Sequence, residues 1–93
     1  MIFEWDEGNR SKIIKRFPLE EVEEFFYQEL LVLQDHNHSH NELRFFAVGL
    51  HQNSRPMWVC FTLRKNKIRV ISARYMHKKE LMAYEKFKKE NKN

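Results

Sequence analysis

The fold of this chain is decided by one stretch, Phe45 to Arg74, which reads FFAVGLHQNSRPMWVCFTLRKNKIRVISAR. Aromatic and β-branched residues, which favour strands, fill three segments of it. These segments are Phe45–Leu50, Pro56–Leu63 and Ile68–Arg74. Short polar turns, His51–Arg55 and Lys65–Lys67, separate them. Because parallel neighbours need a crossover of about a dozen residues or more, these short connections predict three consecutive antiparallel strands.

Helical patterns lie before this stretch. A weakly amphipathic segment predicts a helix from about Glu7 to Lys15, and Pro18 stands where a second helix would begin. Apolar residues at helical spacing and glutamates in the first turns support this second helix. Two short apolar segments, Ile2–Trp5 and Leu30–Leu33, predict strands, and His36–Asn41 is typical of a loop.

A helix from Met76 to about Lys89 closes the pattern, with Glu80, Tyr84 and Phe87 along one side. The order of elements predicts an α+β fold: an antiparallel sheet of about four strands, two N-terminal helices and one C-terminal helix. With 93 residues and no internal linker, the chain is expected to form one domain over residues 1–93.

Composition excludes several classes of protein. An apolar share of 42% is enough for a packed core, and no segment is long and apolar enough for a membrane helix. The start of the chain is acidic where a signal peptide is basic. A single cysteine, Cys60, cannot form an internal disulfide. These features predict a cytoplasmic protein that has no membrane partner.

Charge is distributed unevenly along the chain. Residues 64–93 carry eleven Lys and Arg against three Glu, a balance of +8, whereas residues 1–63 carry six against ten, a balance of −4. A basic C-terminal third indicates a polyanionic partner, and nucleic acid is the first candidate. The alternative is that the lysines of a helix only keep its surface solvated.

The hairpin around Asn66 decides which arginines share a face of the sheet. With a loop of two or four residues, Arg64 and Arg69 lie on one face, and Ser72 and Arg74 lie on the other. A loop of three residues without a bulge instead places Arg64, Ser72 and Arg74 together. Both registers stay open. In either case the arginines are expected to line an open, anion-facing surface, because guanidinium groups are costly to bury.

Familiar catalytic motifs are missing from the sequence. It has no glycine-rich phosphate loop, no G-x-S-x-G and no Cys-x-x-Cys. The alternating His36, His38 and His40 would share one face of a strand, but no further ligand cluster accompanies them, so no metal is expected. Cys60 lies among apolar residues and is expected to pack as a small hydrophobic side chain. Trp5 and Trp58 are expected to belong to the core.

The remaining Arg, Lys, His, Glu and Tyr residues suit RNA cleavage without a metal or another cofactor. In that reaction a 2′-hydroxyl attacks the neighbouring phosphate, a base and an acid move the protons, and cations stabilise the developing charge. Glu80 or His38 would transfer protons, and Arg64, Arg69, Arg74 and Lys15 would hold the phosphate. A non-catalytic RNA- or DNA-binding module would use the same cations, and so would a protein that docks an acidic partner.

Four segments of the chain resemble the BrnT family, the toxins of type II toxin–antitoxin pairs. The segments are Phe3-Glu4-Trp5-Asp6, Glu20–Phe26, the D-x-x-H-S-x-x-E-x-R pattern from Asp35 to Arg44, and the ending Thr62-x-Arg64 … Arg69-x-Ile71-Ser72-Ala73-Arg74 … Glu80-x-x-x-Tyr84. The resemblance covers roughly residues 2–85. It implies a RelE-like ribonuclease fold, RNA cleavage that arrests translation, and a small DNA-binding cognate antitoxin. Whether the ribosome is a further partner stays open.

The expected site residues follow from both lines of reasoning. Catalysis is assigned to Arg64, Arg69, Arg74, Glu80 and His38, and RNA binding is assigned to Lys15, Arg16, Ser72, Tyr84, Lys78 and Lys79. The chain departs from its relatives between the first two helices. Many of them carry Lys-His-Gly-Val where this chain has Lys15-Arg16-Phe17-Pro18-Leu19. The histidine is absent there, and the guanidinium of Arg16 cannot act as a base at neutral pH.

Overall fold

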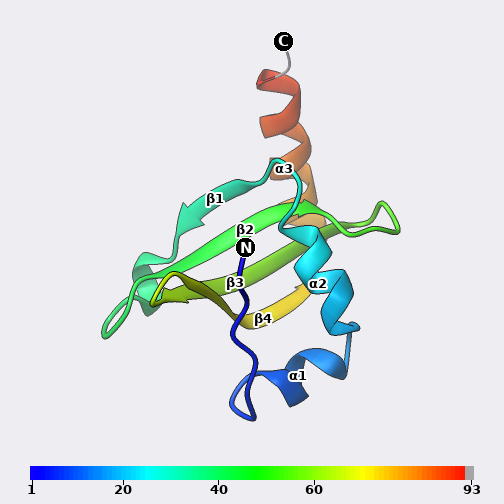
Figure 1. The fold of residues 1–93 in the computed structure, drawn as a ribbon. Helices are drawn as coiled ribbons and strands as arrows, with labels where there is room; N and C mark the ends of the chain where they lie inside the picture. Colours follow the sequence, from blue (N-terminus) through cyan, green and yellow to red (C-terminus); the bar gives the residue numbers. More distant parts are fainter. Residues whose placement is uncertain (92–93) are drawn as a thin grey trace.

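A four-stranded antiparallel sheet forms the centre of the computed structural model, which describes residues 1–91 (Figure 1). The strands lie side by side in the order of the sequence. They are β1 (Leu31–Gln34), β2 (Arg44–Leu50), β3 (Pro56–Arg64) and β4 (Lys67–Tyr75). This order leaves β1 and β4 as the two edges of the sheet.

Within residues 1–91, three α-helices accompany the sheet: α1 (Arg10–Ile14), α2 (Leu19–Phe25) and α3 (Lys78–Glu90). Pro18 is the N-cap residue of α2, and its extended backbone (φ −60°, ψ 141°) turns the chain into that helix. A single 3₁₀ turn, His36–His38, follows β1. In Figure 1, α1 and α2 lie on one side of the sheet, whereas α3 projects away from its end. No helix in the described part of the chain is long and apolar enough to cross a membrane.

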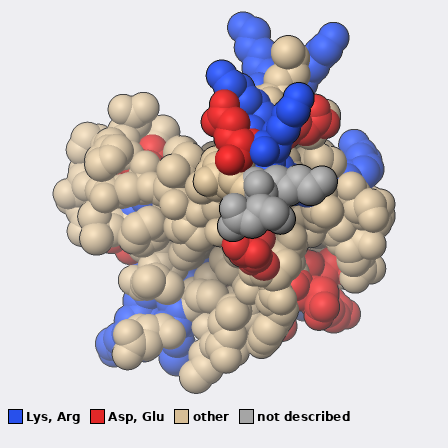
Figure 2. Space-filling view, turned by 90° about the horizontal axis from the view of Figure 1, so that it is seen from above, with Lys and Arg blue, Asp and Glu red and all other residues tan. Residues whose placement is uncertain are grey.

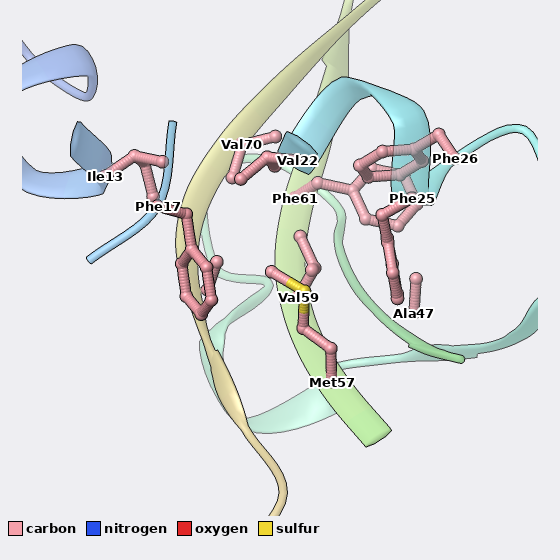
Figure 3. Packing of buried hydrophobic residues seen from close by; sticks show 11 residues of the cluster. Ile13, Phe17, Val22, Phe25, Phe26, Ala47, Met57, Val59, Phe61 and Val70 are labelled. Carbon is pink, nitrogen blue, oxygen red and sulfur yellow. The ribbon is translucent and has the colours of Figure 1, made fainter. Parts of the chain in front are cut away.

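The core fills the space between the sheet and the first two helices (Figure 3). Val22 and Phe25 of α2 pack against inward-facing residues of β3 and β4 such as Val59 and Val70, and all four side chains are almost fully buried. Burial of this kind contributes about 1.5–3 kcal/mol per large apolar side chain. Phe17 also belongs to this core, so the link between α1 and α2 anchors both helices.

The second face of the sheet carries no N-terminal helix. We define this face by three cross-strand rows of β2, β3 and β4: Arg44–Thr62–Arg69, Phe46–Cys60–Ser72 and Val48–Trp58–Arg74. Neighbours within a row lie about 5 Å apart. The prediction that Trp58 belongs to the core is wrong: it is half-buried on the second face, while Trp5 packs against the core. Cys60 is buried, and burial raises the pKa of its thiol.

The register of the β3–β4 hairpin differs from both predicted alternatives. The loop has two residues, Lys65 and Asn66, both at positive φ. A loop of two residues was expected to separate Arg69 from Ser72 and Arg74. The structure puts all three on the second face, because β4 has a bulge: Val70 pairs with Phe61, but Ser72 pairs with Cys60. Ile71 is therefore an extra residue that shifts the alternation by one.

The α+β class and the four-stranded antiparallel sheet are confirmed, and the element boundaries need two corrections. The expected opening strand is only one parallel bridge, from Phe3 to Ile68. The chain leaves the sheet there because the Asp6 carboxylate accepts a hydrogen bond from the Gly8 amide (2.8 Å) and closes a turn. The first helix is shorter than predicted because this turn occupies residues 7–9. The RelE-like assignment stays a prediction.

Candidate functional site

A hollow of about 440 Å³ lies where the loop after β1 meets the ends of β2 and β3. Imidazole, guanidinium, carboxylate and amide groups line it. The lining residues are His38, His40, Asn41, Glu42, Arg44 and Arg64. Two cations and two imidazoles in one hollow are a suitable set for binding a phosphate and for moving a proton beside it.

His38 is the best-positioned proton-transfer group in this hollow. Its Nδ1 lies 2.9 Å from Oδ2 of Asp35, and Asp35 is buried whereas 66% of the His38 side chain is exposed. A buried carboxylate at one ring nitrogen fixes the orientation of the ring and leaves Nε2 directed to solvent. His51 also contacts a carboxylate, with Nε2 2.6 Å from Oε1 of Glu21, but its ring is buried and cannot reach a substrate.

The 3₁₀ turn presents His38 because its backbone is held at both ends. The Ser39 hydroxyl donates to the Asp35 carbonyl (2.6 Å) and accepts from the Arg44 amide (3.0 Å). The Asp35 amide in turn donates to the Arg44 carbonyl (2.7 Å). The turn therefore rests directly on the first residue of β2. His36 and His38 lie in this turn rather than on a strand, and no group of residues in the described range is placed to hold a metal.

Arg44 and Arg64 supply the positive charge. The Nε of Arg44 is buried without a hydrogen-bond partner. Arg64 is about half exposed (47%), and its Nε donates to Oε2 of Glu42 (3.2 Å). Because an exposed ion pair of this kind contributes little energy, a phosphate can compete with Glu42 for Arg64.

Arg69 lies on the same face of the sheet as Arg64, but it is less exposed and its ion pairs are with the N-terminal segment. Its Nη1 donates to Glu4 (2.9 Å) and to Asp6 (2.8 Å), and only 12% of the side chain is exposed. The hydrogen bonds from Arg69 lower the pKa of Asp6, and those to Asp6 raise the pKa of Arg69. Arg69 thus fastens the N-terminal segment to β4.

Arg74 forms a two-pronged ion pair with Glu80, with distances of 2.7 and 2.8 Å. Its guanidinium also lies 4.4 Å from the centre of the Trp58 ring. Arg74, helped by the backbone amide of His77, lowers the pKa of Glu80 to about 2. Glu80 is therefore ionised at neutral pH and caps α3, an arrangement that favours orienting Arg74 over accepting a proton.

The other predicted residues are spread over the surface. Lys15 and Arg16 are exposed just after α1, and Lys78 and Lys79 are exposed in the first turn of α3. Ser72 is half-buried in the middle of the second face, and burial raises the pKa of Tyr84 on α3. Figure 2 shows Lys and Arg side chains interspersed with Asp and Glu around α3, and a separate basic group at the lower left.

The structure brings Arg64 and His38 together in the hollow, and it pairs Arg74 with Glu80 elsewhere. The residues that sequence reasoning left without a role are Asp35, Glu42 and Arg44. All three belong to the D-x-x-H-S-x-x-E-x-R pattern, and that spacing is the signal that could have found them. The pattern works because the 3₁₀ turn folds Asp35 under His38 and returns the chain at Arg44.

Comparisons with known proteins place the chain in a family. No curated protein and no solved structure matches the chain. A family model does match, over residues 5–80, and it includes the hollow, Arg69 and the Arg74–Glu80 pair. Its description is a ribonuclease toxin, BrnT, of a type II toxin–antitoxin system. Because the match spans most of the chain, this protein belongs to the BrnT family of ribonuclease toxins.

Proposed function

We propose that this toxin cleaves RNA in the hollow between the 3₁₀ turn and β3, without a metal ion, and thereby arrests translation in the cytoplasm. The observation that carries the proposal is the exposed His38 ring, which a buried Asp35 holds beside Arg44 and Arg64. This set supplies both a proton-transfer group and the positive charge that a phosphodiester transition state requires.

In the proposed reaction, Nε2 of His38 takes the proton of a 2′-hydroxyl, and the resulting oxygen attacks the adjacent phosphorus. The bond to the 5′-oxygen breaks, and that oxygen receives a proton from a second acid in the hollow, for which His40 is available. The products are a 2′,3′-cyclic phosphate and a 5′-hydroxyl. Arg44 and Arg64 stabilise the additional negative charge of the pentacoordinate phosphorus.

The remaining predicted residues bind the parts of the RNA that lie outside the hollow. Arg74 ends the row that begins at Val48, and the exposed Lys78 and Lys79 follow it on α3. With Ser72 and Tyr84, they form a path for the sugar–phosphate backbone across the second face. Lys15 and Arg16 add charge near α1, and Arg69 acts through the N-terminal segment that it holds.

The test is cleavage of a defined single-stranded RNA by the purified toxin in EDTA, beside Arg64→Ala and the exposed control Arg10→Ala. We expect the toxin and Arg10→Ala to give products with cyclic phosphate ends, and Arg64→Ala to be slower by about 10²–10³-fold. Cleavage that EDTA abolishes would contradict the mechanism. Intact RNA that remains bound to the toxin would instead identify a binding module.

Arrest of translation is tested in cells and on ribosomes. We expect induction of the toxin to stop incorporation of labelled amino acids, and Arg64→Ala to leave it unchanged. If purified toxin cleaves RNA only on translating ribosomes, the ribosome is an additional partner. If incorporation continues while RNA is cleaved, translation is not the target.

A further inference from the structure

The outer edge of β1 is open for pairing. In the described part of the chain, β1 pairs only with β2, so its outer backbone groups face solvent. The strand is apolar on both of its faces. Leu31 and Leu33 lie on the second face, opposite Val48 and Phe46, and Val32 lies on the core face, opposite Ala47. Val32 and Leu33 are nevertheless 47% and 53% exposed.

Edge strands of monomeric proteins are usually protected against pairing. Charged side chains, proline, bulges or a covering helix serve this purpose. Apart from its shortness, β1 has none of these protections, since it reads Leu-Val-Leu-Gln and pairs with β2 without a register shift. An unpaired edge with apolar groups on both faces suits the addition of another strand.

A groove of about 870 Å³ adjoins the beginning of β1 and separates it from α3. Leu30, Leu31, Tyr84 and Phe87 give it an apolar lining. Lys88 and Lys89 line it as well, together with one carboxylate, Glu29, so the charged groups of the lining have a net positive charge. No residue of α3 is fully buried, and Phe87, Lys88 and Lys89 are exposed, so this end of the helix presents apolar and basic groups to solvent.

We propose that the cognate antitoxin adds an extended segment to the free edge of β1 and places acidic side chains against Lys88 and Lys89 in the groove. Charge complementarity selects this occupant over a second copy of the toxin, because a second copy would bring lysines of its own α3 to the same edge. Membership of a toxin–antitoxin family supplies the antitoxin as a partner, and the proposed docking does not depend on which residues cleave RNA.

This position also gives a route to inhibition, which rests on the proposed nuclease site. The groove lies at the start of β1, and the strand ends at Gln34, directly before Asp35 and the hollow. A segment paired along the whole of β1 therefore ends beside His38. It would obstruct the approach of RNA without contacting the catalytic groups.

The first test measures the affinity of the purified cognate antitoxin for the toxin by calorimetry. Val32→Lys/Leu33→Lys places two charges on the edge, and Leu63→Lys, a comparably exposed apolar residue of β3 (54%), is the control. We expect the double variant to bind at least about tenfold more weakly and the control within about twofold of the parent. Equal affinity of parent and double variant would overturn the proposal.

The second test needs no variant and so does not depend on how the substitutions fold. Amide hydrogen exchange of the complex should show new protection in residues 31–34, because half of these amides would gain a strand partner. Unchanged exchange there overturns strand addition. A second result would also overturn it. This result is a toxin dimer, seen by sedimentation, that Val32→Lys/Leu33→Lys breaks without changing the affinity of the toxin for the antitoxin.

Charge reversal tests the groove separately. Lys88→Glu/Lys89→Glu should weaken antitoxin binding and reduce its dependence on salt, while Lys65→Glu/Lys67→Glu in the β3–β4 hairpin should do neither. Equal effects of both pairs would show general electrostatic attraction and overturn the assignment to the groove. None of these assays contains RNA, so their results do not depend on whether the nuclease proposal is correct.

Discussion

Three arginines of one sheet face have different surroundings and therefore different expected roles. Arg64 is half exposed at the hollow, where it pairs with Glu42 and more distantly with Glu4. Arg69 is only 12% exposed and is held by Glu4 and Asp6. Arg74 is held by Glu80 and lies over Trp58. Side chains that already use their hydrogen bonds internally must give them up before binding a phosphate. Arg64 is therefore the arginine of the three that is best able to bind substrate.

Replacing Arg69 should act on stability first. Arg69→Ala leaves Glu4 and Asp6 near each other without their cation and releases the N-terminal segment from β4. We expect a melting temperature several degrees below that of the parent, measured by circular dichroism, together with residual cleavage of RNA by the folded fraction. An unchanged melting temperature with full loss of cleavage would instead place Arg69 at the substrate.

The Arg74–Glu80 pair predicts a pH dependence of stability. Because the pKa of Glu80 falls from 4.5 to about 2 on folding, its carboxylate stabilises the fold above pH 4.5. This contribution is lost as the pH falls from about 4.5 to about 2. Glu80→Gln should thus melt below the parent at pH 7, and the difference should shrink toward pH 2.

Melting curves across this pH range check the prediction, with Glu85→Gln on the exposed side of the same helix as the control. The control should follow the parent at every pH. A gap between Glu80→Gln and the parent that persists unchanged at pH 2 would show that the loss arises from something other than the ion pair.

At the scale of elements, the sequence predicted the four strands of the sheet well, but it predicted their register poorly and added an opening strand that is only one bridge. The strand segments were visible because aromatic and β-branched residues end sharply at polar turns. The bulge at Ile71 was not visible, since Ile71 is as good a strand residue as its neighbours. This one extra residue brings Ser72 and Arg74 to the face of Arg69, so the composition of the face could not be derived from alternation alone.

The β3–β4 turn offers a prediction about stability at this scale. Lys65 and Asn66 have φ values of 50° and 66°, a left-handed conformation that costs energy for lysine. Two-residue hairpin loops of this kind favour Asn-Gly. Lys65→Asn/Asn66→Gly should therefore raise the free energy of unfolding by about 1 kcal/mol, as measured by urea denaturation. A decrease would show that the lysine side chain makes a compensating contact.

At the scale of the whole molecule, composition and element order predicted the α+β class and the antiparallel sheet. They did not predict the hollow, because Asp35, His38, Arg44 and Arg64 come from three separate segments that only the folded sheet brings together. They also did not predict how loosely α3 is attached. Tyr84 and Phe87 lie along one side of the helix, but no residue of α3 is fully buried.

The separation of charge predicts a salt-dependent interaction with RNA. A balance of +8 in residues 64–93 should make the logarithm of the RNA affinity fall linearly with the logarithm of the salt concentration. Lys78→Ala/Lys79→Ala should reduce that slope by up to about two units, measured by fluorescence anisotropy with a labelled RNA. An unchanged slope would remove this part of α3 from the RNA path.

The central claim is that His38 moves the proton in RNA cleavage, and two histidines of the same 3₁₀ turn test it most directly. The measurement is the single-turnover rate of RNA cleavage by His38→Ala and by His36→Ala, which is exposed and outside the hollow lining. We predict a loss of about 10²–10⁴-fold for His38→Ala and a rate within about twofold of the parent for His36→Ala. Equal rates for the parent and for folded His38→Ala would contradict the account.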